Sequence, residues 1–243
     1  MKLLFIRHGD PDYEHDNLTD AGKREARLLV PRMQRERPDA CFLSPLGRAQ
    51  ATAQPTLDAL GENATVYDWL QEFSIPVLRP DKSGGLSRVP WDWLPQDWLQ
   101  DPRLMDAIRW KENEVMAGAG VGEAYDRVTA KFDALLASYG YEREGLWYRV
   151  TEPSTKTLAF FCHFGIGCVF LSHLMNCSPM ILWQGLSMAP SSVTTVYTEE
   201  RRPGIAVFRT AAAGDISHLY EKNVAPSFAA RFCEVYGNGD RID

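Results

Sequence analysis

The strongest constraint on the fold of this chain is a pattern of three apolar runs, each of which stops abruptly at polar residues. Short apolar runs of this kind are typical of strands that are buried on both faces of a sheet. The runs are LLFI before Arg7-His8-Gly9, ACFL before Ser44-Pro45, and TLAFFC before His163-Phe164-Gly165. Because ligands of open α/β sheets bind beyond the carboxyl ends of the strands, the pattern predicts that these three clusters meet at a binding site.

Helix-like stretches accompany the strands, at residues 20–36, 47–60 and 166–176, and Thr19 is placed to cap the first of them. A strand followed by a helix, and repeated, implies right-handed crossovers between parallel strands. We therefore expect an α/β fold, a three-layer α/β/α sandwich with a mostly parallel sheet and helices on both faces.

The remaining segments contain further predicted strands and a long stretch of different composition. Further strands are expected at about 64–67, within YEREGLWYRVTEP, and at 191–198 and 205–210, the last two forming a hairpin at or near the sheet edge. Residues 73–140 begin with a stretch rich in proline and tryptophan and continue with helical patterns at about 104–117 and 122–138. We interpret residues 1–243 as a single domain, with 73–140 as a cap-like insertion over the carboxyl edge of the sheet.

Composition excludes several classes of function. The net charge of −6 argues against a general nucleic-acid-binding protein. No apolar run reaches the roughly 18 residues that cross a bilayer, and the start MKLLFIRHG is typical of a strand and not of a signal peptide. Five cysteines without a CxxC pair indicate reduced thiols and a cytoplasmic protein. Five histidines without HxH or HExxH spacing predict no metal site.

Four basic or imidazole side chains fall at the predicted edge: Arg7, His8, Arg48 and His163. Hydrolysis of a phosphate monoester needs a nucleophile, cations on the non-bridging oxygens and an acid for the departing alcohol. Guanidiniums bind phosphate oxygens in a bidentate way, and their charge disfavours protonation of a neighbouring imidazole. His8 is therefore the candidate nucleophile.

Two further residues complete this predicted phosphate pocket. Gly9 lets the backbone pass close to a bound anion, since it has no side chain. Ser44, or the amides that follow it at a helix N-terminus, can donate further hydrogen bonds to that anion.

The ordered motifs resemble those of the histidine phosphatase superfamily, also called the phosphoglycerate mutase-like family. They are Arg7-His8-Gly9, Leu18-Thr19-x-x-Gly22, Ser44-Pro45-x-x-Arg48-Ala49-x-x-Thr52-Ala53 and a late strand that ends in His163. The resemblance spans residues 3 to about 175, and GDISHL (214–219) is similar to the closing segment of the family.

The resemblance implies that His8 becomes phosphorylated, and that Arg7, Arg48 and His163 bind the transferring phosphoryl group. Glu72, in the sequence LQE, matches the proton donor of the family. The main interpretation is a phosphatase that needs no metal or cofactor and acts on a small-molecule phosphate ester through phosphohistidine.

Two departures from the family pattern keep alternatives open. Phe164 stands where glycine usually follows the second histidine, and the segment DPDYEHDN is shorter than in the mutases. One alternative is phosphoglycerate mutase-type transfer, against which the short segment and the unfamiliar insertion argue. Another is a non-catalytic phosphate-binding protein, against which the complete set of pocket residues argues.

Individual roles also have alternatives. Asp10 and Glu14 could share or replace the role of Glu72. The three tryptophans of the insertion are expected to form the core of a cap, with stacking on a ring-bearing substrate as the alternative; they are Trp91, Trp93 and Trp98. His15, His173 and His218 are given no catalytic role, although His218 could approach the pocket rim.

Overall fold

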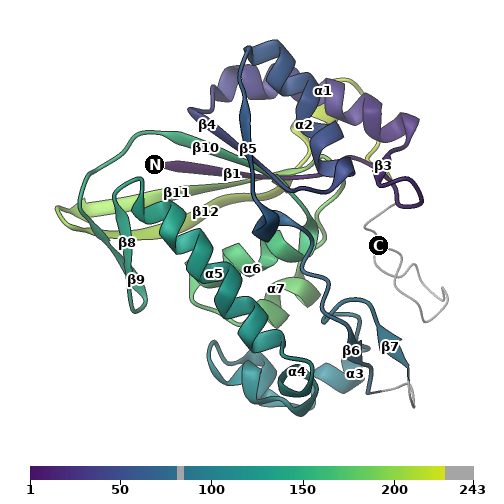
Figure 1. The fold of residues 1–243 in the computed structure, drawn as a ribbon, viewed down its shortest axis with the longest axis vertical. Coiled ribbons are helices and arrows are strands. Elements are labelled where there is room, and N and C mark those ends of the chain that lie inside the picture. The colour runs from purple at the N-terminus through teal and green to yellow at the C-terminus, as the bar shows by residue number, and fades with distance from the viewer. Residues whose placement is uncertain (81–84, 228–243) are drawn as a thin grey trace.

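A computed structural model describes residues 1–80 and 85–227 (Figure 1). Its main sheet has the strand order β5-β4-β10-β1-β11-β12-β9-β8 within the described residues. The strands of this sheet are β1 (Lys2–Arg7), β4 (Ala40–Leu43), β5 (Ala64–Val66), β8 (Tyr141–Glu144), β9 (Trp147–Val150), β10 (Thr157–Cys162), β11 (Val193–Arg202) and β12 (Ile205–Asp215). Two small hairpins pair β2 (Pro11–Asp12) with β3 (Asn17–Leu18), and β6 (Val77–Leu78) with β7 (Leu86–Ser87).

Helices cover both faces of the main sheet, so the predicted α/β/α sandwich is confirmed (Figure 1). The α-helices are α1 (Asp20–Glu36), α2 (Gly47–Leu60), α3 (Pro95–Trp98), α4 (Glu114–Gly118), α5 (Val121–Ala137), α6 (Phe164–Met175), α7 (Pro179–Gly185) and α8 (Ser217–Tyr220). Short 3₁₀ helices are η1 (Asp68–Leu70), η2 (Pro102–Met105) and η3 (Arg109–Glu112).

The prediction of a mostly parallel sheet holds for the half of the sheet that carries the motifs. Strands β5, β4, β10 and β1 pair in parallel, whereas β1-β11, β11-β12, β12-β9 and β9-β8 pair antiparallel. The predicted C-terminal hairpin is confirmed, but it lies inside the sheet. The edge beyond it is a second hairpin, β8-β9, where the sequence indicated one short strand.

The side chains of β1 point alternately to the two faces of the sheet, and each face has its own hydrophobic core. Leu4 and Ile6 are fully buried with residues of α1 and α2, while Leu3 and Phe5 point to the other face and pack with α5 and α6. Successive side chains of a strand point to opposite faces, so a strand covered on both faces must be apolar throughout.

Capping residues set the start of α1 and the end of α2. The hydroxyl oxygen of Thr19 accepts a hydrogen bond from the amide of Gly22, which confirms the predicted N-cap of α1. Gly61 ends α2 in the left-handed conformation at φ +68°, which glycine adopts at no steric cost. Helix α6 begins at Phe164, two residues earlier than predicted and directly after His163.

The insertion differs from its predicted form in two ways. The segment expected to be one helix at 104–117 contains η2, η3 and the short α4, whereas the second predicted helix is α5. Helix α5 does not lie over the carboxyl edge but on a face of the sheet, since the ring of Phe132 packs 5.9 Å from that of Phe160. The rest of the insertion, with β6, β7, α3 and α4, lies at one end of the molecule (Figure 1).

Two smaller observations bear on the composition. Among the described residues, no helix is both long enough and apolar enough to cross a membrane. Cys41, Cys162, Cys168 and Cys177 are free, while Cys233 lies outside the described residues.

Candidate active site

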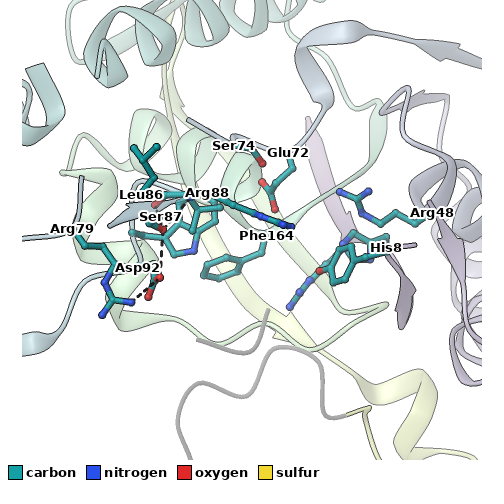
Figure 2. A pocket seen from close by; sticks show the side chains of 14 residues that line it. His8, Arg48, Glu72, Ser74, Arg79, Leu86, Ser87, Arg88, Asp92 and Phe164 are labelled. Atoms are coloured by element: carbon teal, nitrogen blue, oxygen red, sulfur yellow. Dashed lines mark hydrogen bonds and ion pairs between the residues drawn. The ribbon is translucent and has the colours of Figure 1, made fainter. Parts of the chain in front are cut away.

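A cavity of about 580 Å³ opens beyond the carboxyl end of β1. Figure 2 shows His8 and Arg48 at one end of it, Arg79 and Asp92 at the other, and Phe164 between them. The cavity therefore joins the sheet edge, where the sequence motifs end, to the insertion.

His8 follows the last residue of β1 and is only 2% exposed. Its Nδ1 lies 2.8 Å from the carbonyl oxygen of Gly9. A carbonyl only accepts, so Nδ1 must carry the proton, and the neutral ring then has its lone pair on Nε2. Burial holds the pKa of His8 well below its ordinary value, and the charges of Arg7 and Arg48 lower this pKa further. Both effects favour the uncharged ring at neutral pH, with the lone pair of Nε2 available.

Arg7 and Arg48 bring two guanidiniums to the same end of the cavity. Nη1 of Arg7 donates to the carbonyl of Met188 at 2.6 Å, and Nη1 of Arg48 donates to Oδ1 of Asp16 at 2.6 Å. The Nε atoms of both arginines are buried without a hydrogen-bond partner among the described residues. Two guanidinium charges that line the same end of the cavity make it a favourable place for an anion.

His163 lies beside His8, with the two ring centroids 5.1 Å apart. Its Nε2 is hydrogen-bonded to the hydroxyl of Ser44 at 2.7 Å, while its Nδ1 is buried and unpartnered in the part of the chain that the structure describes. Burial lowers the pKa of His163 well below its usual value, with His8, Arg48 and Arg7 adding to the effect. Both histidines are therefore neutral, and neither repels the other.

Glu72 lies in the cavity wall against the N-terminus of α6, where it accepts three backbone hydrogen bonds. Its Oε1 accepts from the amides of Phe73 at 2.8 Å and Ile166 at 3.0 Å, and its Oε2 accepts from Gly165 at 3.2 Å. Burial nevertheless raises the pKa of Glu72 above its ordinary value, although the three amides and Arg7 oppose the rise. A buried carboxyl with a raised pKa suits a group that gives and takes a proton.

The glycines of the first two motifs allow close backbone packing under the site. A Cβ on Gly9 would lie 2.9 Å from the carbonyl oxygen of Gly22, and a Cβ on Gly22 would overlap the backbone of Asp10. The amide of Gly9 donates to the hydroxyl of Thr52 at 2.9 Å, and this hydroxyl donates to the carbonyl of Arg48 at 2.8 Å. The spaced motif residues are thus neighbours in space.

The structure brings most of the predicted site residues together. Arg7, His8, Arg48 and Glu72 line the cavity; His163 and Ser44 lie next to it and contact each other, not the cavity. Of the alternatives to Glu72, Asp10 accepts a hydrogen bond from Thr19 at 2.6 Å and Glu14 is exposed. Neither lines the cavity.

Phe164 and the tryptophans form a packed wall. The ring of Phe164 lies 5.8 Å from the guanidinium of Arg7 and 5.9 Å from the ring of Trp91. Trp91 is 1% exposed and packs on Trp183, and Trp93 is also buried. The expectation that the tryptophans form a core is confirmed for these two, while Trp98 is half-buried.

Sequence reasoning missed several residues of the site. Asp16 fixes Arg48 and also accepts from the amide of Gly47 at 2.6 Å, and Tyr13 stacks over the guanidinium of Arg48 at 5.3 Å. Arg79 and Arg88 line the far half of the cavity. The only signal for Asp16 was its place in the short segment before LTDAG.

No group of three or more histidine, cysteine, aspartate or glutamate side chains among residues 1–80 and 85–227 is arranged to hold a metal ion.

Comparison with known proteins places this geometry in a family. The model described as "Histidine phosphatase superfamily (branch 1)" matches residues 3–210. Phosphoserine phosphatase 1 from Hydrogenobacter thermophilus is 23% identical over 141 residues, which cover 53% of this chain and 61% of that relative. This chain therefore matches less than two thirds of the relative's length.

Solved structures show the same fold at low identity. One is a mutant phosphoserine phosphatase from Entamoeba histolytica in complex with phosphoserine, with a TM-score of 0.59 and 16% identity over 90% of this chain and 98% of that one. Another is a mycobacterial glucosyl-3-phosphoglycerate phosphatase, with a TM-score of 0.57 and 20% identity over 88% of this chain and 98% of that one.

Proposed function

Because the chain belongs to the histidine phosphatase superfamily, we propose that it hydrolyses small-molecule phosphomonoesters with His8 as the nucleophile. The observation that carries this proposal is the neutral imidazole of His8, whose Nδ1 is bonded to the Gly9 carbonyl, in the same cavity as the guanidiniums of Arg7 and Arg48. This combination offers a lone pair and an anion site at one place.

The reaction has two steps, and each balances on groups already described. In the first, Nε2 of His8 attacks phosphorus in line, the bond from phosphorus to the ester oxygen breaks, and Glu72 gives its proton to the leaving alcohol. In the second, water attacks the phosphohistidine, Glu72 takes a proton from it, and inorganic phosphate leaves. Arg7 and Arg48 bind the non-bridging oxygens, so the positive charge that stabilises the transition state comes from their side chains, while the neutral His163, which does not line the cavity, packs beside the ring of His8.

Trapping the intermediate tests the proposal. A phosphomonoester labelled on phosphorus is mixed with the enzyme, turnover is quenched without acid, and the labelled peptide is mapped. We expect an acid-labile label on His8 and no label in His8→Ala. A label on another residue, or turnover without any label, would contradict the mechanism, and phosphate release measured against isomer formation on phosphoglycerates separates hydrolysis from mutase-type transfer.

The far half of the cavity supports a finer proposal about the substrate. Arg88 directly follows β7 and lines the cavity, and among the described residues it makes no ion pair, whereas Arg79 pairs with Asp92 at 3.1 Å (Figure 2). A guanidinium in the same cavity as Arg7 and Arg48, without an ion-pair partner among the described residues, favours esters with a second acidic group. Phosphoserine, named for two of the similar proteins, is an ester of that class.

A matched substrate pair tests the role of Arg88. Phosphoserine and phosphoethanolamine differ only in the carboxylate, so we expect kcat/KM to favour phosphoserine. Arg88→Met should reduce this preference about tenfold or more, since a charge-assisted hydrogen bond is worth about 1.5–3 kcal/mol. Arg24→Met, an exposed arginine on α1, is the control. Equal kcat/KM for the two esters in the wild type would contradict the second-anion proposal.

A further inference from the structure

The C-terminal motif GDISHL (214–219) does not line the cavity, yet most of its members are fixed by specific contacts. The amide of Gly214 donates to the hydroxyl of Thr194 at 3.0 Å, and Gly214 has a φ of +66° that favours glycine. Asp215 forms an ion pair with Arg32 of α1 at 3.2 Å and accepts from the amide of Ser217 at 2.6 Å. These contacts fix the short helix α8 against the sheet and α1.

One side chain of this motif, that of His218, contacts Ser191, a residue next to the proposed active site. His218, 2% exposed, lies with its Nε2 3.0 Å from the hydroxyl oxygen of Ser191, which is fully buried. A buried imidazole and a buried hydroxyl each need a partner, and here they partner each other.

Ser191 belongs to the 188–192 segment, which contacts both Arg7 and His8. The amide of Ser191 donates to the carbonyl of His8 at 3.0 Å, and the carbonyl of Ser192 accepts from the amide of Arg7 at 3.0 Å. The carbonyl of Met188 accepts from the guanidinium of Arg7 at 2.6 Å. The segment therefore holds the backbone of the proposed nucleophile and the guanidinium beside it.

The backbone of Ser191 is in a conformation that serine rarely adopts. Its φ of +59° lies in the left-handed region, where residues with a Cβ are disfavoured. Such conformations persist when surrounding contacts hold them, and the bond from Ser191 to His218 is a side-chain contact of that kind. Losing the bond would let the residue relax and move its amide away from His8.

We infer that His218 is a positioning residue: through Ser191 it holds the 188–192 segment in the shape that fixes His8 and Arg7 for in-line attack. This rests on the proposed function, because the groups positioned are its nucleophile and its phosphate ligand. The GDISHL motif then serves the active site from outside the cavity, with Arg32 and Asp215 anchoring α8 and His218 reaching Ser191.

The test uses the full chain with p-nitrophenyl phosphate, and compares Ser191→Ala, His218→Leu, the double variant and His218→Gln. We expect each of the first two to lower kcat about tenfold, roughly the worth of one hydrogen bond, with KM changed by less than about twofold. The double variant should fall no further, because both changes break one bond. His218→Gln keeps a side-chain amide that can reach Ser191, so most of kcat should return.

Ser172→Ala is the matched control. The buried hydroxyl of Ser172, on α6, is hydrogen-bonded to the hydroxyl of Tyr125 on α5 at 3.1 Å, away from the cavity. The kcat of this variant should not change. A readout independent of turnover is hydrogen exchange of the Ser191 amide, which should become faster in both Ser191→Ala and His218→Leu, while that of Phe5 in β1 should not. Unchanged kcat in both single variants, losses that add in the double, or unchanged exchange at Ser191 would overturn the inference. A wild type that hydrolyses no phosphomonoester would instead refute the proposed function, and the exchange measurement would still decide whether His218 holds the segment.

Discussion

The charge state of three buried histidines is set by where the fold places them. Burial lowers the pKa of His8 and of His163 well below the ordinary value, and the nearby arginines lower both further. Burial and Arg32 lower the pKa of His218 to about 4. All three rings are therefore neutral at pH 7, which leaves His8 free to attack phosphorus and lets His218 share a hydrogen bond with a serine.

The first prediction concerns the pH dependence of kcat/KM. His8 must be unprotonated to attack, so activity falls as pH drops through its pKa, and this acid limb should lie well below pH 6.5. Glu72 must be protonated to aid the leaving alcohol, so the alkaline limb should follow its raised pKa, above 4.5. A kcat/KM profile measured on an ester whose leaving group needs protonation checks this, and an acid limb at or above pH 6.5 would contradict it.

The second prediction separates the candidates for the proton donor. Glu72→Gln should lower kcat by about 10²–10⁴-fold, the usual contribution of general acid–base catalysis, because the amide cannot give a proton. Binding of inorganic phosphate should be kept, since the arginines that bind it are unchanged. Turnover and phosphate binding are measured together, with the exposed Glu14→Gln as control. If Glu14→Gln lost activity and Glu72→Gln kept it, the acid would be Glu14.

At the scale of elements, α6 connects the second motif histidine to the proposed acid. The helix starts immediately after His163, so its first amides point into the site and bind the carboxylate of Glu72. Anions are stabilised at helix N-termini, which explains how a carboxylate fits in so buried a place. The approach of Trp91 to the same turn leaves no room for a side chain at Gly165.

The third prediction compares two glycines of α6. A Cβ on Gly165 would overlap the indole of Trp91 and lie 2.7 Å from Oε1 of Glu72, whereas a Cβ on Gly167 meets nothing within 4 Å. Gly165→Ala should therefore displace the cavity wall and lower both Tm and kcat. Gly167→Ala should keep kcat and raise stability by about 0.5–1 kcal/mol, because alanine favours a helix. Thermal melts and kinetics of the pair check this; equal effects would show that the wall is not tightly packed.

At the scale of the whole molecule, the insertion and the sheet share one aromatic core. Trp91 and Trp110 of the insertion pack with Trp183 of α7, at 5.2 and 6.4 Å between ring centroids. The same cluster continues to Phe170 of α6 and Phe5 of β1 under the sheet. A core without a break gives the insertion no independent set of contacts.

The fourth prediction follows from this shared core: the insertion and the rest of the described fold should unfold as one cooperative unit. Four of the seven tryptophans, Trp91, Trp93, Trp98 and Trp110, lie in the insertion, so their fluorescence reports mainly on it, while far-UV circular dichroism reports on the whole chain. The two urea transitions should coincide. Separate midpoints would show that 73–140 unfolds as a domain of its own.

Much of the parallel half of the sheet could be predicted from the sequence, because its signals are local. The apolar runs of β1, β4 and β10, the cap at Thr19 and the helical patterns of α1 and α2 each arise from residues close in the chain. The polar residues after those strands could be placed at one edge by topology alone. For this reason the sequence alone predicts that Arg7, His8 and Arg48 share one pocket.

Local patterns in the amino-acid sequence are enough to identify the parallel strands and the side chains that follow them, since periodicity and capping act over a few residues. Three features of the site depend instead on the packing of the folded chain: the pairing of Asp16 with Arg48, the place of Arg88 in the cavity, and the contact of His218 with Ser191. These contacts join residues whose separation in the chain carries no periodic signal. Their geometry depends on how the insertion, the β11-β12 hairpin and α8 pack. This packing depends on how apolar side chains from the whole chain are buried together in the core.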